Sequence, residues 1–151
     1  MQYEKSNYIK IAVDASGAVI LNQRKEILLV QEKKENIAGL WNIPSGRVEN
    51  GESLLYALHR EINEETGLKL SYVEYLNTYL GTLLDGSVIA RHVWITRYDE
   101  KQQIQSRFKN EIIDCQFVSN DKFQKMFEEG IIRMYHLKHI FQDALNYKFL
   151  N

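Results

Sequence analysis

The chain has 151 residues, of which 44% are hydrophobic and 26% charged, and its 19 basic and 20 acidic residues leave a formal net charge of -1. This size and composition are those of one ordinary globular domain, so we expect residues 1–151 to form a single domain. No run of Lys or Arg is long enough to follow a phosphate backbone, which makes long nucleic acid a weak candidate partner. A small phosphorylated ligand remains compatible with this charge.

The N-terminal stretch MQYEKSNYIK lacks the apolar segment of a secretory signal, and no window approaches the roughly 20 apolar residues of a membrane span. We therefore expect a soluble, cytoplasmic protein without a membrane partner, either as a monomer or as a homodimer. The one cysteine, Cys115, cannot form an internal disulfide. Its setting in IIDCQFVS favours a buried structural thiol on a strand over a nucleophile.

The first predicted elements are two antiparallel strands. The apolar stretches IKIAVDASGAVIL and EILLVQ, within residues 8–31, are separated by the polar turn Asn22-Gln23-Arg24-Lys25. A polar loop follows over residues 32–39, and residues 40–43 resume an extended pattern. Pro44 then removes one backbone donor, so regular structure is expected to pause over residues 44–51.

A helix is predicted to begin after Ser53, whose side chain can cap it. Leu55, Leu58 and Ile62 recur at spacings of three and four, which predicts that they form the flank that enters the core. Gly67 is suited to end the helix, because glycine readily adopts the left-handed backbone conformation.

The second half of the chain predicts a hairpin, a further strand and two helices. Residues 73–84 and 87–98 flank Asp85-Gly86, which indicates a two-residue hairpin loop, and residues 112–118 alternate like another strand. Ser119 or Asn120 can cap a short helix that ends at Gly130. A final helix is expected over residues 135–149, with one apolar side formed by Leu137, Ile140, Phe141, Ala144 and Leu145. This order predicts an α/β layer structure in which helices pack on a mixed sheet.

The most informative stretch is GRVENGESLLYALHREINEETGL, residues 46–68. Glu61, Glu64 and Glu65 have helical spacing, so their carboxylates fan over roughly a third of the helix circumference. Like charges this close repel by about 1 kcal/mol per pair in water, and by more where solvent is excluded, unless a cation lies among them. A hard divalent cation would balance the charge of these carboxylates. Arg60 lies beside the cluster, where it can orient a carboxylate, and we expect Glu52 to approach from the preceding loop and pair with Arg60.

This stretch resembles the Nudix box, whose pattern is Gly, five residues, Glu, seven residues, Arg-Glu-apolar-any-Glu-Glu-any-Gly-apolar, and all nine defined positions agree. The resemblance implies a Nudix fold, a mixed β-sheet sandwiched between α-helices. It also implies hydrolysis of a nucleoside diphosphate linked to another group, with Mg²⁺ or Mn²⁺. By that resemblance Glu61, Glu64 and Glu65 are metal ligands, Arg60 orients them, and Glu52 is a supporting acid.

The general base is expected outside or inside this box. Glu111 precedes the predicted strand 112–118, where a downstream loop carboxylate is often found in the family, and it is our first candidate. Asp114 and Glu100 are the alternatives. For Glu111 a solvated loop acid is nearly as good an explanation.

The remaining clues concern the substrate. Ser45 stands where the family often has glycine before Gly46, the first glycine of the box, which is expected to lie close to the substrate. Pro44 is the one proline, so the downstream prolines that mark ADP-ribose and NADH hydrolases are absent, as is the tyrosine associated with dinucleoside polyphosphates. These absences favour nucleoside di- or triphosphates, including damaged ones. Aromatic candidates to contact the base are Trp41, Tyr79, Trp94 and Phe117, and cationic candidates for the phosphates are Lys33, Lys34 and Arg91, although packing or a solvated surface explains each one at least as well.

Two other functions remain open. The chain could be a nucleotide-sensing or protein-binding module that keeps the fold without turnover, although the intact carboxylate set argues against it. It could also be an RNA 5′-end pyrophosphohydrolase, which would need a basic path for the RNA.

Overall fold

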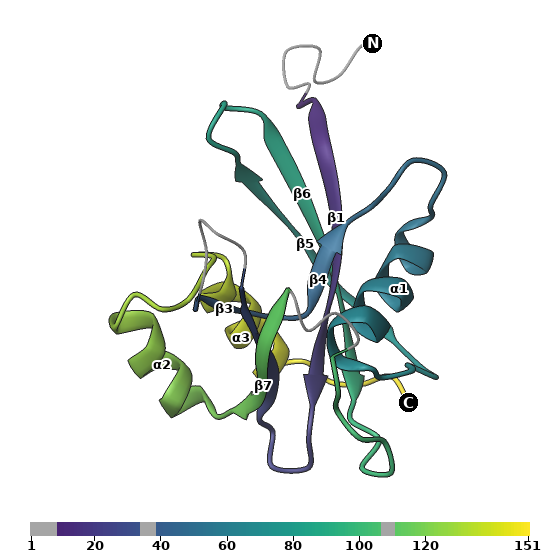
Figure 1. The fold of residues 1–151 in the computed structure, drawn as a ribbon, viewed down its shortest axis with the longest axis vertical. Helices are drawn as coiled ribbons and strands as arrows, with labels where there is room; N and C mark the ends of the chain where they lie inside the picture. Colours follow the sequence, from purple (N-terminus) through teal and green to yellow (C-terminus); the bar gives the residue numbers. More distant parts are fainter. Residues whose placement is uncertain (1–8, 34–38, 107–110) are drawn as a thin grey trace.

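The computed structural model of the chain describes residues 9–33, 39–106 and 111–151. A seven-stranded mixed sheet lies between helices on both of its faces (Figure 1), which confirms the predicted α/β sandwich. The strands are β1 (Ile11–Leu21), β2 (Ile27–Glu32), β3 (Trp41–Asn42), β4 (Ser45–Arg47), β5 (Glu74–Thr82), β6 (Val88–Arg97) and β7 (Ile112–Val118), and the helices are α1 (Leu54–Thr66), α2 (Asn120–Glu128) and α3 (Leu137–Leu145).

Strand β1 is the centre of the sheet. It runs parallel to β6 along almost its whole length, and β6 pairs with β5 in the antiparallel hairpin that the sequence predicts. The loop of that hairpin differs from the prediction. Leu83 N–H donates to Ser87 O at 2.8 Å and Gly86 N–H to Leu83 O at 2.9 Å, so three residues, not two, form the loop. Gly86 has φ 85°, which is the left-handed position that closes such a three-residue turn.

The predicted antiparallel pair formed by β1 and β2 is confirmed only at its turn, where Leu21 pairs with Ile27. Farther along, the same side of β1 is taken by β4, which pairs antiparallel with residues 15–17, and Ala18 N–H donates to Pro44 O at 3.1 Å. Strand β2 therefore diverges and pairs with β3 and β7. The sheet splits at this point, and β4 brings the start of the 46–68 stretch onto the central strand.

Alternation along β1 sends neighbouring residues into two separate cores. Val19 packs with α2 and α3, whereas Ile20 packs with Leu58 and Ile62 of α1. In the first core the rings of Phe123 and Phe141 stack with centroids 3.9 Å apart. The helices on the two faces are thus held by opposite sides of the same strand.

The starts of α1 and α2 are those that the sequence predicts, whereas α3 begins at Leu137 and not at residue 135. Ser53 Oγ accepts from Tyr56 N–H at 3.1 Å and Gly67 ends α1 with φ 75°. Ser119, and not Asn120, caps α2 by accepting from Lys122 N–H at 3.2 Å. Within residues 9–33, 39–106 and 111–151, no helix has both the length and the apolar character that crossing a membrane requires.

The last helix is shorter than predicted, because α3 ends at Leu145 and the chain continues as an irregular segment to residue 151. That segment is held by Glu74, which is 6% exposed at the start of β5. The Glu74 carboxylate accepts from Tyr147 Oη at 2.5 Å, from Leu150 N–H at 2.9 Å and from Tyr72 Oη at 2.6 Å. A continued helix would have to give up these contacts.

We expect the stabilising effect of Glu74 to disappear in acid. Burial alone would raise its pKa, but hydrogen bonds from the Leu150 N–H and from the Tyr147 and Tyr72 hydroxyls hold the pKa at about 2, below the ordinary 4.5. The carboxylate therefore contributes stability above pH 4.5, which is lost as the pH falls towards 2. The free energy of unfolding of wild type should exceed that of Glu74→Gln at pH 7, and the difference should shrink steadily down to pH 2.5.

The control for this experiment is Glu128→Gln, at an exposed position near the end of α2. At pH 7 its free energy of unfolding should be close to that of wild type, because most surface substitutions change stability by less than about 0.5 kcal/mol. A Glu74→Gln difference that stays constant with pH would contradict the role assigned to the ionised carboxylate.

Candidate active site

Helix α1 turns its carboxylate flank towards the protein. Glu65 is 7% exposed, whereas Leu55 is 46% exposed, so the prediction that Leu55 belongs to the core flank is wrong. Leu58 and Ile62 are buried as expected, together with Ala57. Leu55 lies on the same side of the helix as Ile62 and Thr66, which are fully buried, so its exposure follows from its place in the first turn of α1 and not from a rotation of the helix. Strand β4 packs against the acidic side of the helix through its small residues Ser45 and Gly46.

Gly46 on β4 is the residue that permits this approach. A Cβ atom built at Gly46 would lie 2.1 Å from the carboxyl carbon of Glu61 and 2.2 and 2.4 Å from its oxygens. Gly46 does not have positive φ, in contrast to Gly51 in the loop that follows, with φ 83°. The glycine at position 46 is therefore explained by the space that Glu61 occupies, and not by turn chemistry.

Ser45 fixes the third glutamate of the helix. Its backbone N–H donates to Glu65 Oε1 at 2.9 Å, so the residue that departs from the common family pattern contacts the acidic flank through its main chain. On the other side Cys115 Sγ contacts Glu65 O at 3.7 Å. Burial, followed by the charges of Asp114 and Glu65, raises the pKa of the half-buried Cys115 thiol to about 12. The thiol is therefore neutral and structural, on a strand, as the sequence predicts.

Arg60 joins three of the carboxylates. It binds Glu52 in bidentate fashion, with Nε to Oε2 at 2.6 Å and Nη2 to Oε1 at 2.8 Å, and this is the predicted pairing. Its Nη1 also lies 2.8 Å from Glu61 Oε1 and 3.3 Å from Glu64 Oε2. The Arg60 hydrogen bonds hold the pKa of Glu52 down at about 2, so Glu52 is ionised throughout the physiological range. One guanidinium thus sets the positions of three side chains.

Around Glu61 the carboxylates outnumber the one guanidinium of Arg60, so a net negative charge remains at the site. Burial raises the pKa of Glu61, Arg60 opposes that rise, and the charges of Glu64 and Glu111 add to it. Glu111 is exposed, its backbone carbonyl accepts from Lys33 N–H at 2.8 Å, and its charge acts on Glu61. The alternative base Asp114 is instead engaged by Cys115 N–H and by Gln116 Nε2, both at 2.8 Å.

The residue types of this site fit a hard divalent cation. Across the described parts of the chain, no three His, Cys, Asp or Glu side chains gather closely enough to enclose a metal ion by themselves. The reason is visible in the contacts, because Arg60 holds Glu61 and Glu64 while the Ser45 N–H holds Glu65. Magnesium needs only one or two carboxylates when waters and substrate phosphates complete its shell. The carboxylates of this site supply oxygen donors and excess negative charge, and they therefore suit such a magnesium ion.

A cationic hollow lies on the other side of β4. Arg91 of β6 pairs in register with Ala15 of β1 and lines a small cavity together with Ser45 and Met134. It also lines a wider cavity of about 610 Å³, with Arg133, Leu80 and Tyr135 on its walls. Arg133 donates to Glu32 Oε1 at 2.8 Å. Burial, and then the charge of Arg133, lower the pKa of Arg91, and no acceptor among the described residues pairs with its guanidinium. A bound anion would pair with the Arg91 guanidinium.

Sequence reasoning identified Arg91 only as one of several cations, and it missed Arg133. No spacing pattern marks either residue, because the two come together through the crossing of β6 and the segment before α3. Lys34, another candidate for the phosphates, lies outside the described residues.

The aromatic candidates lie in packed positions. Trp41 is 8% exposed in the core beside α2 and α3, and its backbone pairs with Ile131 and Arg133. Tyr79 Oη donates to Asp143 Oδ2 at 2.6 Å. Trp94 packs on the α1 side, and Phe117 meets Tyr98 with centroids 5.0 Å apart. Packing accounts for all four, and a substrate contact by Trp41 stays a prediction.

Comparison with known proteins agrees with this fold. The profile of the NUDIX domain matches residues 12–137, which is most of the chain. The chain therefore belongs to the Nudix family. A NUDIX hydrolase from Nitrosomonas europaea has the same fold, with a TM-score of 0.73 at 24% identity over 90% of this chain and 89% of that one.

Sequence relatives match over part of the chain. The chain is 52% identical over 52 residues to the 8-oxo-dGDP phosphatase NUDT18 of Danio rerio, which is 34% of this chain and 16% of that protein. It is 40% identical over 60 residues to an RNA pyrophosphohydrolase of Ruthia magnifica, which is 40% of this chain and 32% of that protein. The match spans only 16 to 19% of the length of the 8-oxo-dGDP phosphatases.

The contact between Gly46 and Glu61 can be tested by a double-mutant cycle. Gly46→Ala should lower the free energy of unfolding by about 1 to 3 kcal/mol, because the new methyl group overpacks against the carboxylate. In a Glu61→Ala background the same change should cost much less, since the clashing group is gone. Denaturant unfolding of the four proteins measures the coupling. Additive effects would show that the two residues do not oppose each other.

Proposed function

We propose that the chain is a divalent-metal-dependent pyrophosphohydrolase domain, spanning residues 1–151, that cleaves a phosphoanhydride bond in a small nucleotide. The observation that carries this proposal is that groups of opposite charge lie on the two sides of one strand. Carboxylates organised by Arg60 lie on one side of β4, and the guanidinium of Arg91, which has no partner among the described residues, lies on the other. We infer that a polyphosphate chain bound with cations extends from the carboxylates to Arg91.

In this proposal Glu61, Glu64 and Glu65 hold Mg²⁺ or Mn²⁺, and Arg60 with Glu52 keeps the carboxylates oriented. The bound metal would neutralise charge on the polyphosphate and lower the pKa of a water molecule. Glu111 would accept the proton of the attacking water, since it is exposed and its charge already acts on Glu61. The products are a nucleoside monophosphate and phosphate or pyrophosphate.

The wider cavity suits the rest of the substrate. Its walls combine the cations Arg91 and Arg133 with apolar side chains such as Leu80, Ile89 and Met134. Cations beside an apolar surface are what a phosphorylated nucleoside requires. We therefore propose nucleoside di- or triphosphates, including oxidised ones, as substrates. The zebrafish relative, named as an 8-oxo-dGDP phosphatase, supports placing oxidised guanine nucleotides among the first compounds to test.

Removing one charged ligand tests the metal assignment. Glu64→Gln should lower the rate by at least ~100-fold while the fold is retained, because catalysis here depends on electrostatic positioning. Product release from a nucleotide panel with Mg²⁺ and with Mn²⁺ measures the effect, and Glu128→Gln is the control that removes a carboxylate from an exposed helix position. Turnover near that of wild type, with unchanged metal dependence, would exclude Glu64 as a ligand.

The same panel separates the alternatives. A sensing or protein-binding module would bind a nucleotide saturably and release no product with either metal. An RNA 5′-end pyrophosphohydrolase, the activity named for the Ruthia magnifica relative, would act faster on triphosphorylated RNA than on mononucleotides. Oxygen-18 from labelled water would identify the phosphorus that is attacked.

Arg91 provides a test of the substrate cavity. Arg91→Met should raise KM by roughly tenfold or more and change kcat less, because a charge-assisted contact to a phosphate of about 1.5 to 3 kcal/mol is lost. Steady-state kinetics of wild type and variant measure both constants. Arg24→Met, at an exposed arginine of the β1–β2 turn, is the matched control. A KM that remains at the wild-type value would remove Arg91 from the phosphate site.

A further inference from the structure

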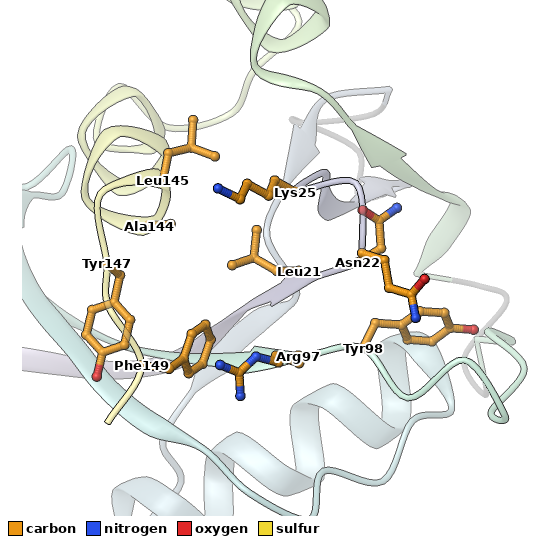
Figure 2. Close-up of a pocket in the computed structure, with 10 residues that line it drawn as sticks. Leu21, Asn22, Lys25, Arg97, Tyr98, Ala144, Leu145, Tyr147 and Phe149 are labelled. Atoms are coloured by element: carbon orange, nitrogen blue, oxygen red, sulfur yellow. The ribbon is translucent and has the colours of Figure 1, made fainter. Parts of the chain in front are cut away.

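A third cavity, of about 480 Å³, lies at the end of β1 that leads into the β1–β2 turn. Its walls are the turn, the end of β6, the end of α3 and the C-terminal segment (Figure 2). The volume is within the range of about 300 to 1,000 Å³ that is usual for small-molecule pockets. None of its lining residues lines the two cavities around Arg91. It is therefore separate from the candidate active site.

The turn that forms one wall holds Lys25 in a strained backbone conformation. Lys25 has φ 59°, and it is the one residue other than glycine with positive φ in the described parts of the chain. Glycine or asparagine would occupy this position at lower cost. A strained backbone at an exposed residue is a reason to look for a function of its side chain.

The strain is imposed by a closed set of hydrogen bonds that does not use the Lys25 side chain. Asn22 Oδ1 accepts from the N–H groups of Arg24 at 3.0 Å and Glu26 at 2.9 Å, and Asn22 Nδ2 donates to Glu26 Oε1 at 2.8 Å. Lys25 N–H donates to Asn22 O at 3.0 Å. Figure 2 shows the Lys25 side chain extending from this turn across the cavity towards Leu145 of α3. No acceptor in the described residues is paired with its ammonium group.

The second cation of the cavity is Arg97 at the end of β6. Its guanidinium lies 4.0 Å from the centroid of the Phe149 ring, and Nη1 donates to Asn151 O at 3.0 Å. Four of its five N–H donors are not used by that bond. The ten residues that line the cavity include Lys25 and Arg97 but no Asp or Glu. The charged side chains that line the cavity therefore favour an anion, and two cations match a dianion.

The other walls are apolar and aromatic. Phe149 and Tyr147 meet edge to face with ring centroids 5.3 Å apart, and Leu21, Ala144 and Leu145 complete this side. Glu74 holds Tyr147 through its hydroxyl at 2.5 Å, which fixes the aromatic wall in place. A flat apolar body thus finds a prepared surface beside the two cations.

We propose that this cavity is a second ligand site, which binds a phosphomonoester attached to a planar aromatic body, as in a nucleoside monophosphate. A phosphomonoester carries a charge of about -1.5 to -2 at neutral pH, which matches Lys25 and Arg97. The aromatic body lies against Phe149 and Tyr147. The proposal does not rest on hydrolysis at the Arg60 site, because the two sites share no residue.

The test is an NMR titration of the ¹⁵N-labelled chain with AMP and GMP, in the Glu64→Gln background and with a chelator, so that neither turnover nor metal contributes. We expect chemical shift changes in the β1–β2 turn and in residues 144–151, with saturation. Adenosine and inorganic phosphate should each bind at least tenfold more weakly, since adenosine lacks the phosphate and inorganic phosphate lacks the aromatic body. Changes confined to the surroundings of Arg91 and Arg133 would overturn the proposal.

Lys25→Gly is the decisive variant. It should weaken AMP binding at least tenfold, while its thermal midpoint stays equal to or above that of the parent protein because the left-handed strain is relieved. Arg24→Gly removes the same charge from the same turn, at a side chain that is 82% exposed and does not line the cavity, and it should leave binding unchanged. Equal losses in the two variants, or no loss in Lys25→Gly, would refute the site.

Discussion

The Arg60 guanidinium is shared by carboxylates from two parts of the chain, and the geometry of the acidic helix depends on it. It holds Glu52 from the loop before α1 and reaches Glu61 and Glu64 along the helix. In the absence of that cation the buried flank of α1 would bring like charges together against β4. The Glu61 carboxylate that Arg60 holds occupies the space that a side chain at Gly46 would need. Fold and site are therefore joined at one contact region, in which a glycine supplies space and an arginine supplies charge.

Much of this could be predicted from the sequence because it is local. The caps at Ser53 and Ser119 and the end of α1 at Gly67 depend on a few neighbouring residues, and so does the pairing of Arg60 with Glu52. The pattern of the 46–68 stretch predicted the acidic cluster, and the order of elements followed from the patterns along the rest of the chain. Interactions between residues that are close in the sequence can be predicted from a single sequence, because they depend only on those residues.

The errors concern contacts between distant segments. Leu55 has the right spacing for the core, but it lies in the first turn of α1, where the packing against distant segments leaves it exposed. Residues 146–149 continue an apolar helical pattern, yet Glu74, far away in the sequence, holds them in another conformation. The cavity around Arg91 likewise forms where β6 meets the segment before α3, and no spacing along the chain indicates it. Such features depend on which strand lies beside which, and periodicity does not contain that information.

The position of β1 also has a kinetic consequence. Its long parallel ladder joins Ile11 to Val88 and Leu21 to Arg97, so the central pairing of the sheet closes a loop that contains half of the chain. Closing such loops is costly in entropy and slows folding. Strand β1 is required for both cores, for the pairing of β4 and for one wall of the Lys25 cavity. Local structure in α1 and in the β5–β6 hairpin can form early, but neither cavity can acquire its shape until that one strand has paired.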